Sequence, residues 1–142
     1  MMSNKSLKEL YREYIEEIWN RKNLAAMDKY FTPDIVDHDA PPGQKPGLEG
    51  LKETFAMMQA AFPDWRIVIE KEVEEGDTVV TRIRTSGTHQ GNFFGMPATG
   101  RQFQSKGIHI LRYQDGKMAE HWGNSDDLGM LHQLGAIQMV GQ

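Results

Sequence analysis

Two long segments of the chain carry apolar residues at every third or fourth position, a spacing that places them on one face of an α-helix. The first segment follows the capping-box sequence Ser6-Leu-Lys-Glu9 and predicts a helix over residues 6–21. The second predicts a helix over residues 48–62, which Pro63 ends. Two shorter helices are predicted by the apolar positions Leu24, Met27, Tyr30 and Phe31, and by Leu128, Leu131 and Leu134 before Gly135.

Elsewhere the apolar period changes to two, which is typical of β-strands with one buried face. A type I′ turn at Asp115-Gly116 joins the last two strands into a hairpin. Helices followed by four long antiparallel strands predict an α+β fold, in which a curved sheet wraps around the N-terminal helices and leaves an internal pocket. With 142 residues, we expect a single domain, 1–142. The strands are expected at 65–74, 78–88, 102–113 and 118–126, with a short one at 35–38.

The composition excludes several classes of function. A formal net charge of -4 and the lack of a basic stripe argue against a nucleic-acid binder, which needs cations to neutralise phosphates. Without cysteine, the chain has no disulfide, thiolate metal site or cysteine nucleophile. Its first residues are polar and charged, and no apolar run reaches the ~18 residues of a membrane span. We therefore expect a cytoplasmic protein that acts neither on nucleic acid nor on a membrane.

Two adjacent carboxylates, Asp126 and Asp127, stand where the last strand passes into the last helix. One of them can cap the helix, because aspartate accepts hydrogen bonds from first-turn N–H groups. If the strand alternates regularly, Asp126 shares the side of Trp122 and Asn124, where desolvation would raise its pKa and make it a usable proton carrier. A β-bulge would reverse this alternation, so the choice between Asp126 and Asp127 as the inward acid stays open.

Other polar side chains could meet this acid in the internal space. Tyr14 has the spacing of the helix core, His38 precedes an irregular loop rich in proline and glycine, and His109 lies on a strand among apolar partners. Each can also be a plain core or surface residue. Phe94 and Met96 lie on a loop, where apolar residues fold back onto a core edge or a pocket mouth. No HxH or HxxxH cluster occurs, so we expect no metal site.

Long stretches of the chain resemble the SnoaL-like polyketide cyclases, many of which carry only the label ester cyclase. The stretches are YIEEIWNRKNLAAMDKYFTPDIVDHDAPPG, GLEGLKETFAMMQAAFPDWRIVIE, GTHQGNFFGMPATGR and GIHILRYQDGKMAEHWGNSDDLGMLHQLGA. The resemblance implies the nuclear transport factor 2-like cone. It also implies an intramolecular aldol ring closure without metal or cofactor, in which one aspartate is the acid/base group. The matching WxxxDxxG position is Asp126, and His38 and His109 fall where relatives often place polar pocket residues.

We therefore hypothesise that Asp126 takes a proton next to a carbonyl group of a small hydrophobic molecule. Tyr14, His38 or His109 would hydrogen-bond the developing enolate oxygen. Two alternatives remain: hydrolysis of an ester or epoxide in the same pocket, and binding of a small ligand without catalysis. Exposed Val68, Ile108 and Ile110 on the outer face of the sheet favour a homodimer. The substrate-binding side chains would be Tyr14, Phe55, Met58, Phe94, Met96, Trp122 and Asn124.

Overall fold

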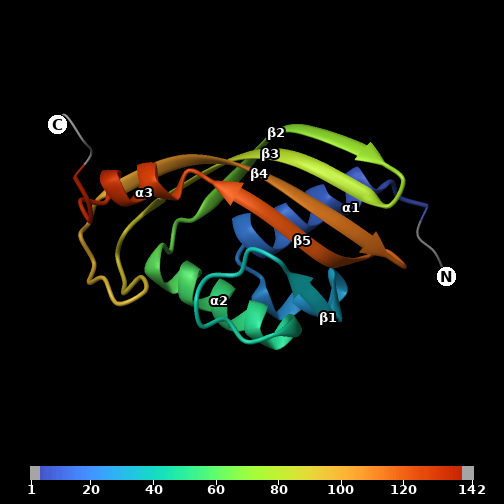
Figure 1. Cartoon of the computed structure of the whole chain (residues 1–142), viewed down its shortest axis with the longest axis horizontal. Helices are drawn as coiled ribbons and strands as arrows, with labels where there is room; N and C mark the ends of the chain where they lie inside the picture. The colour runs from blue at the N-terminus through green and yellow to red at the C-terminus, as the bar shows by residue number, and fades with distance from the viewer. Residues whose placement is uncertain (1–3, 139–142) are drawn as a thin grey trace.

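The sheet has five strands in the order β1-β5-β4-β3-β2, in a computed structural model that describes residues 4–138. Strands β2 (Arg66–Glu75), β3 (Thr78–Thr88), β4 (Gln102–Gln114) and β5 (Lys117–Ser125) are antiparallel, whereas β1 (Phe31–Asp37) runs parallel to β5. Helices α1 (Leu7–Tyr14) and α2 (Gly47–Ala61) lie on one side of the curved sheet (Figure 1). The predicted α+β cone is confirmed.

The first predicted helix is present but changes its winding. Ser6 caps it, because its side chain accepts a hydrogen bond from the backbone N–H of Glu9 at 3.2 Å. After α1 the chain continues as a π-helix, η1 (Ile15–Asn20). A wider turn brings residues five apart together, and the indole N–H of Trp19 donates to the Tyr14 hydroxyl at 2.9 Å. The two rings thus form one buried unit. A short 3₁₀ helix, η2 (Leu24–Lys29), leads into β1.

A bulge in β5 determines which of its side chains face the helices. Arg112 pairs with Glu120, but the next residue of β4, Tyr113, pairs with Met118, which leaves Ala119 without a partner. The extra residue reverses the alternation beyond it. His121, Gly123 and Ser125 therefore share the side of His109, and Trp122 and Asn124 lie on the opposite side. The expectation that Trp122 and Asn124 face inward is therefore wrong.

The edge strand β1 starts earlier than predicted and joins the main sheet. Its last residue, Asp37, is in register with His121, and the backbone N–H of His38 donates to the carbonyl of His121 at 2.9 Å. The parallel pairing places the carboxylate of Asp37 beside the inward face of β5. Helix α3 (Asp127–Gln133) follows β5 at the far end of the sheet.

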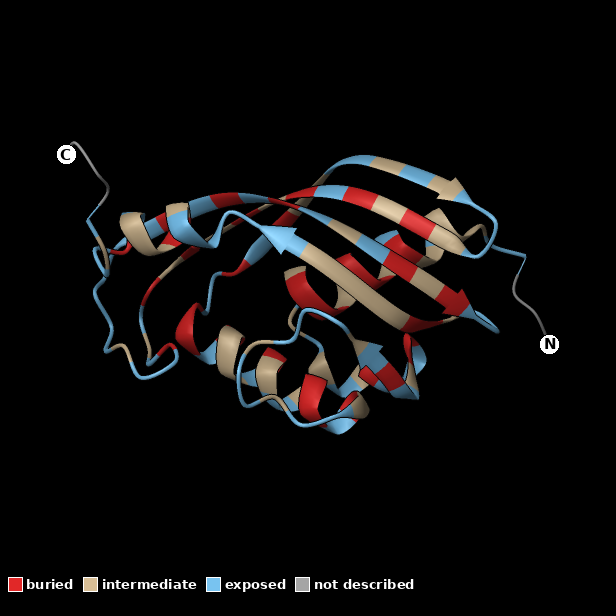
Figure 2. Cartoon of the chain, viewed as in Figure 1, coloured by how far each residue is buried: buried red, intermediate tan, exposed pale blue. Residues whose placement is uncertain are grey.

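A core rich in aromatic side chains fills the space between the sheet and the helices. Phe62 is fully buried and packs against Trp65, Phe93 and Phe103 at ring-centroid distances of 5.1 to 5.5 Å. Buried positions alternate with intermediate ones along most of β3 and with exposed ones along most of β4 (Figure 2). Within residues 4–138, no helix is long and apolar enough to cross a membrane.

The start of α2 offers a test of this packing. Alanine is favoured over glycine in helices by about 1 kcal/mol, yet we expect Gly50→Ala to lower the free energy of unfolding by about 1–3 kcal/mol. The added methyl group would lie 1.6 Å from the backbone oxygen of Lys45. Urea unfolding measures the difference. The neighbouring variant Glu49→Ala, at a side chain 84% exposed, is the control and should stay within about 0.5 kcal/mol. A Gly50→Ala protein as stable as the original would contradict this account.

Candidate functional site

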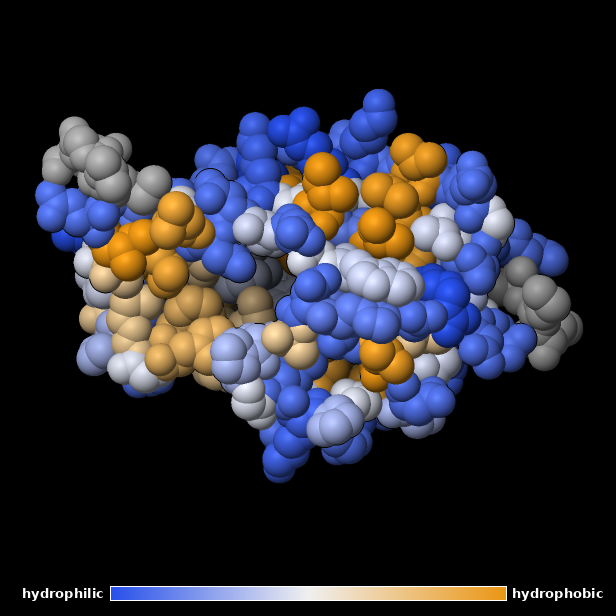
Figure 3. Space-filling view, in the orientation of Figure 1, coloured by the Kyte–Doolittle hydropathy of each residue, from blue (hydrophilic) through white to orange (hydrophobic). Residues whose placement is uncertain are grey.

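A cavity of about 790 Å³ lies between the concave side of the sheet and the helices. This volume is within the range of small-molecule sites. Most of its wall is apolar, and apolar side chains also gather on the surface at the α3 end of the molecule (Figure 3). Of the predicted site residues, the lining includes Tyr14, Phe55, Met58, Phe94, Met96 and His109. Their roles toward a substrate stay predictions.

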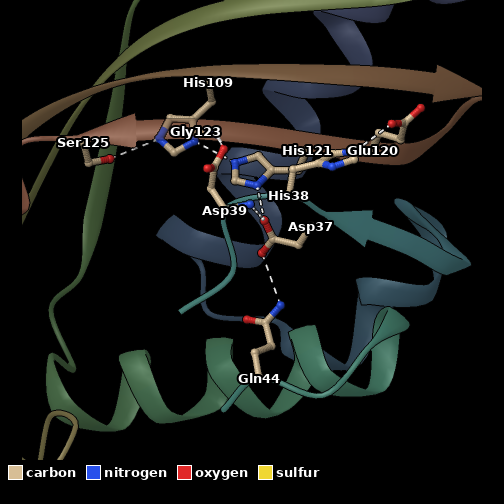
Figure 4. Close-up of polar contacts among 9 residues, drawn as sticks. All are labelled: Asp37, His38, Asp39, Gln44, His109, Glu120, His121, Gly123 and Ser125. Atoms are coloured by element: carbon tan, nitrogen blue, oxygen red, sulfur yellow. Dashed lines mark hydrogen bonds and ion pairs between the residues drawn. The ribbon is translucent and has the colours of Figure 1, made fainter. Parts of the chain in front are cut away.

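The polar part of the wall is a chain of hydrogen-bonded side chains from three strands (Figure 4). His109 Nδ1 lies 2.8 Å from His121 Nε2, and His121 Nδ1 lies 2.8 Å from Asp37 Oδ1. At one end, Ser125 Oγ is 3.4 Å from His109 Nε2. At the other end, the amide of Gln44 donates to Asp37 Oδ2 at 3.2 Å. Imidazole groups are thus connected to a carboxylate at the cavity wall.

The charge states along this chain follow from burial and from the neighbouring groups. Burial, together with repulsion from His121, lowers the pKa of His109 to about 4, although Asp37 and Asp39 act in the opposite direction. Burial alone would raise the pKa of Asp37, but the hydrogen bond and charge of His121, with hydrogen bonds from Gln44 and the Asp39 backbone, hold that pKa below its usual value. At neutral pH, therefore, His109 is neutral and Asp37 is ionised.

The two carboxylates at the start of α3 occupy different positions. Asp126 caps the helix, because its Oδ1 accepts a hydrogen bond from the backbone N–H of Gly129 at 2.9 Å, and it is not part of the cavity lining. Asp127 does line the cavity. Burial and the adjacent charge of Asp126 raise the pKa of Asp127. The inward acid is thus Asp127, the alternative that the sequence had left open.

His38 lies outside the cavity, contrary to the prediction. Its ring stacks on Trp122 with centroids 4.6 Å apart, and its Nε2 lies 2.8 Å from Glu120 Oε2. Glu120 also accepts a hydrogen bond from Arg112. These four side chains form a polar and aromatic cluster on the other side of β5. The reversal of β5 explains why Trp122 and Asn124 are also absent from the cavity lining.

Sequence reasoning missed Asp37, Asp39 and His121 as cavity residues. All three line the cavity, and Asp39 Oδ2 accepts a hydrogen bond from the backbone N–H of Gly123 at 2.8 Å. One signal was available, since two consecutive apolar residues, Met118 and Ala119, are both buried where strict alternation would expose one of them. Such a pair is compatible with a bulge.

The cavity wall is acidic. Its lining includes three carboxylates, from Asp37, Asp39 and Asp127, whereas no lysine or arginine is among the described residues that line it. No group of three or more His, Cys, Asp or Glu within residues 4–138 has a geometry that could hold a metal ion.

Comparison with known proteins gives a consistent result. The family model of the SnoaL-like polyketide cyclases matches residues 8–134. The aklanonic acid methyl ester cyclase DnrD of Streptomyces peucetius is 35% identical over 108 residues, which cover 75% of this chain and 72% of the relative. The nogalonic acid methyl ester cyclase of Streptomyces nogalater is 32% identical over 114 residues, 77% of this chain and 83% of the relative.

The fold is also found among solved structures. TsrD from Streptomyces laurentii superimposes with a TM-score of 0.85 at 28% sequence identity, over 96% of this chain and 100% of that one. The family match extends over almost the whole described chain and includes every strand of the cavity wall. This protein therefore belongs to the SnoaL-like polyketide cyclase family.

Proposed function

We propose that this cyclase-type enzyme closes a ring in an uncharged, largely apolar carbonyl compound, by acid/base catalysis that requires no cofactor. The observation that carries the proposal is a neutral, partly buried imidazole, His109, in the wall of a mostly apolar cavity. A neutral imidazole can accept a proton, and an apolar surrounding strengthens each electrostatic interaction with the reacting atoms. The relatives named above are methyl ester cyclases, which supports the same reaction class.

The reaction can be written with the groups in the cavity. His109 Nε2 takes a proton from the carbon next to a carbonyl group, and the electron pair of the broken C–H bond forms an enolate. The enolate carbon attacks a second carbonyl group of the same molecule, and the new alkoxide recovers the proton from His109. Tyr14 lines the cavity and accepts a hydrogen bond from Trp19, so its own O–H can donate to the enolate oxygen. Burial raises the pKa of Tyr14 well above its usual value and keeps it neutral.

The acid/base role that the family resemblance implies for Asp126 stays a prediction, and the geometry favours His109. The Asp126 carboxylate caps α3. Its Oδ1 is occupied by the backbone N–H of Gly129, and the side chain is not part of the cavity lining. By contrast, the lone pair of His109 is held by one long contact, 3.4 Å from Ser125 Oγ.

We further propose that the protein is a cytoplasmic homodimer. The supporting feature is the sheet face away from the cavity, where the side chains of Ile108 and Ile110 are 54% and 38% exposed. Trp122 and His38 continue this face. Contact through this face would leave the cavity accessible in both subunits.

The two candidate bases can be distinguished by ring closure of aklanonic acid methyl ester, the compound named in the S. peucetius relative. We expect His109→Gln to lower the rate about 10²–10⁴-fold, the usual contribution of a general base. Asp126→Asn should lower it less than about tenfold. His38→Gln, the same substitution outside the cavity, serves as the control and should have no effect. Loss of activity in Asp126→Asn with normal thermal unfolding would restore the aspartate as the base. Binding without turnover in every variant and in the original protein would favour a ligand-binding role.

The pH dependence gives a second test. The base must be unprotonated, and His121, Asp37 and Asp39 face His109 while its pKa lies at about 4. We expect kcat/KM to stay constant as the pH falls from about 8 to 5 and to decrease about tenfold per pH unit below about 4. An ordinary imidazole would cause a decrease from about pH 6.5. Circular dichroism in the same buffers separates this effect from unfolding. A decrease that starts near pH 6.5 would contradict the assignment.

The acidic wall predicts selectivity between two forms of one compound. We expect aklanonic acid methyl ester to bind at least about tenfold more tightly than the free acid at pH 7, because the free carboxylate would approach Asp37, Asp39 and Asp127 with no cation to compensate. Titration calorimetry measures both affinities. Asp127→Asn removes one of the three carboxylates and should therefore reduce the difference between the affinities for the ester and the free acid. Glu53→Gln, on the exposed side of α2, is the control. Equal affinities would contradict an uncharged substrate.

A further inference from the structure

The hydrogen-bonded chain at the cavity wall has a direction. An ionised carboxylate can only accept hydrogen bonds, and the pKa of Asp37 is held low. His121 Nδ1, 2.8 Å from Asp37 Oδ1, must therefore carry a proton. With a single proton on His121, held at Nδ1, His121 Nε2 has a lone pair and accepts from His109 Nδ1 at 2.8 Å. His109 Nε2 is then the unprotonated atom.

Two glycines make room for this arrangement. A Cβ atom at Gly123 would lie 2.4 Å from His109 Nδ1 and 2.9 Å from His121 Nε2. A Cβ atom at Gly107 would lie 3.1 Å from His109 Nε2 and 2.5 Å from Ser125 Oγ. Any larger residue at Gly123 would separate the two imidazoles. The inward face of the β4–β5 pair therefore accommodates both rings only because these two positions lack side chains.

We propose that Asp37, acting through His121, holds His109 in the tautomer whose unprotonated Nε2 faces the cavity, and receives the positive charge when His109 accepts a proton. Asp37 and His121 are thus positioning residues. The functional part of the proposal rests on the proposed role of His109 as the base, whereas the tautomer itself does not depend on it.

The hydrogen-bonded chain can also stabilise the positive charge that His109 gains when it accepts a proton. When His109 Nε2 binds the proton from the substrate carbon, the proton on His109 Nδ1 can pass to His121 Nε2. His121 is then the cation, 2.8 Å from the Asp37 carboxylate, and His109 is neutral again. The reverse transfers return the proton to the alkoxide. The positive charge thus moves from the ring of His109 to an ion pair between His121 and Asp37. The ion pair lowers the free-energy cost of holding the charge at the cavity wall.

The alternative is a purely structural role, in which the hydrogen bond between Asp37 and His121 only holds β1 against β5. The two roles differ in what Asp37→Asn does. The side-chain amide has nearly the shape of the carboxylate but can donate, so it can reverse the hydrogen bond between residue 37 and His121 and the one between His121 and His109. His121 Nδ1 would accept, His121 Nε2 would donate to His109 Nδ1, and His109 Nε2 would carry the proton. A structural role predicts altered stability but no reversal of the tautomer.

The experiment is ¹⁵N NMR of the imidazole groups in the full chain at pH 7, with resonances assigned by His109→Gln and His121→Gln. In the original protein we expect His109 Nδ1 protonated and Nε2 unprotonated. In Asp37→Asn we expect the opposite tautomer. Kinetics with aklanonic acid methyl ester should show kcat lowered about 10²-fold or more with KM changed less than about threefold. Asp39→Asn is the matched control, since it removes a carboxylate that lies near His109 but does not belong to the hydrogen-bonded chain. This variant should keep the original tautomer.

Each result is decisive. A protonated His109 Nε2 in the original protein would overturn the proposal, even if Asp37→Asn does not fold. A tautomer that is the same in Asp37→Asn and in the original protein would overturn it as well. If the tautomer reverses while kcat stays the same, Asp37 has no functional role through His109. If His109→Gln retains full activity but the tautomers are as expected, the proposed base is wrong and the assignment of the tautomer stands.

Discussion

The position of β5 between β1 and β4 is the constraint on which the site depends. One strand, in register with Asp37 on one side and with His109 and its neighbours on the other, brings together residues that are far apart in the sequence. The bulge at Ala119 then selects the side chains of β5 that face them. Without the extra residue, His121 would lie on the outer side and Trp122 on the inner side. The polar chain therefore exists because of a single irregularity in the pairing of two strands.

The fold could be predicted from the sequence because its signals are local. Apolar periods, the capping box at Ser6 and the Asp115-Gly116 turn each determine the structure of a short stretch, and the order of the elements then suggests the architecture. The inward face of β5 could not be predicted this way. It depends on how two strands pair along their length, and an error of one residue reverses every side chain beyond it. The parallel pairing of β1 is similarly a property of the assembled sheet.

The same distinction applies to the candidate site. Tyr14, Phe55 and Met58 lie in the cavity wall because helix periodicity places them there. His109 lies there because β4 is regular. His38, Trp122 and Asn124 were misplaced because they lie at or beyond irregular points, the end of β1 and the bulge. The resemblance of long stretches identified the family correctly, but the motif match at Asp126 does not specify the direction in which that side chain points.

The strand that supplies Asp37 also affects how the protein can associate with other chains. As the edge strand beside β5, β1 carries Pro33, which cannot donate a hydrogen bond, as well as Asp34. The opposite edge, β2, ends in the segment from Glu70 to Glu75, in which every residue except Val73 is charged. Proline and charge at an edge oppose the addition of another strand. Both borders of the sheet are therefore protected against intermolecular β-pairing, and aggregation through continuous sheets is disfavoured even though Ile108 and Ile110 are exposed on the outer face of the sheet.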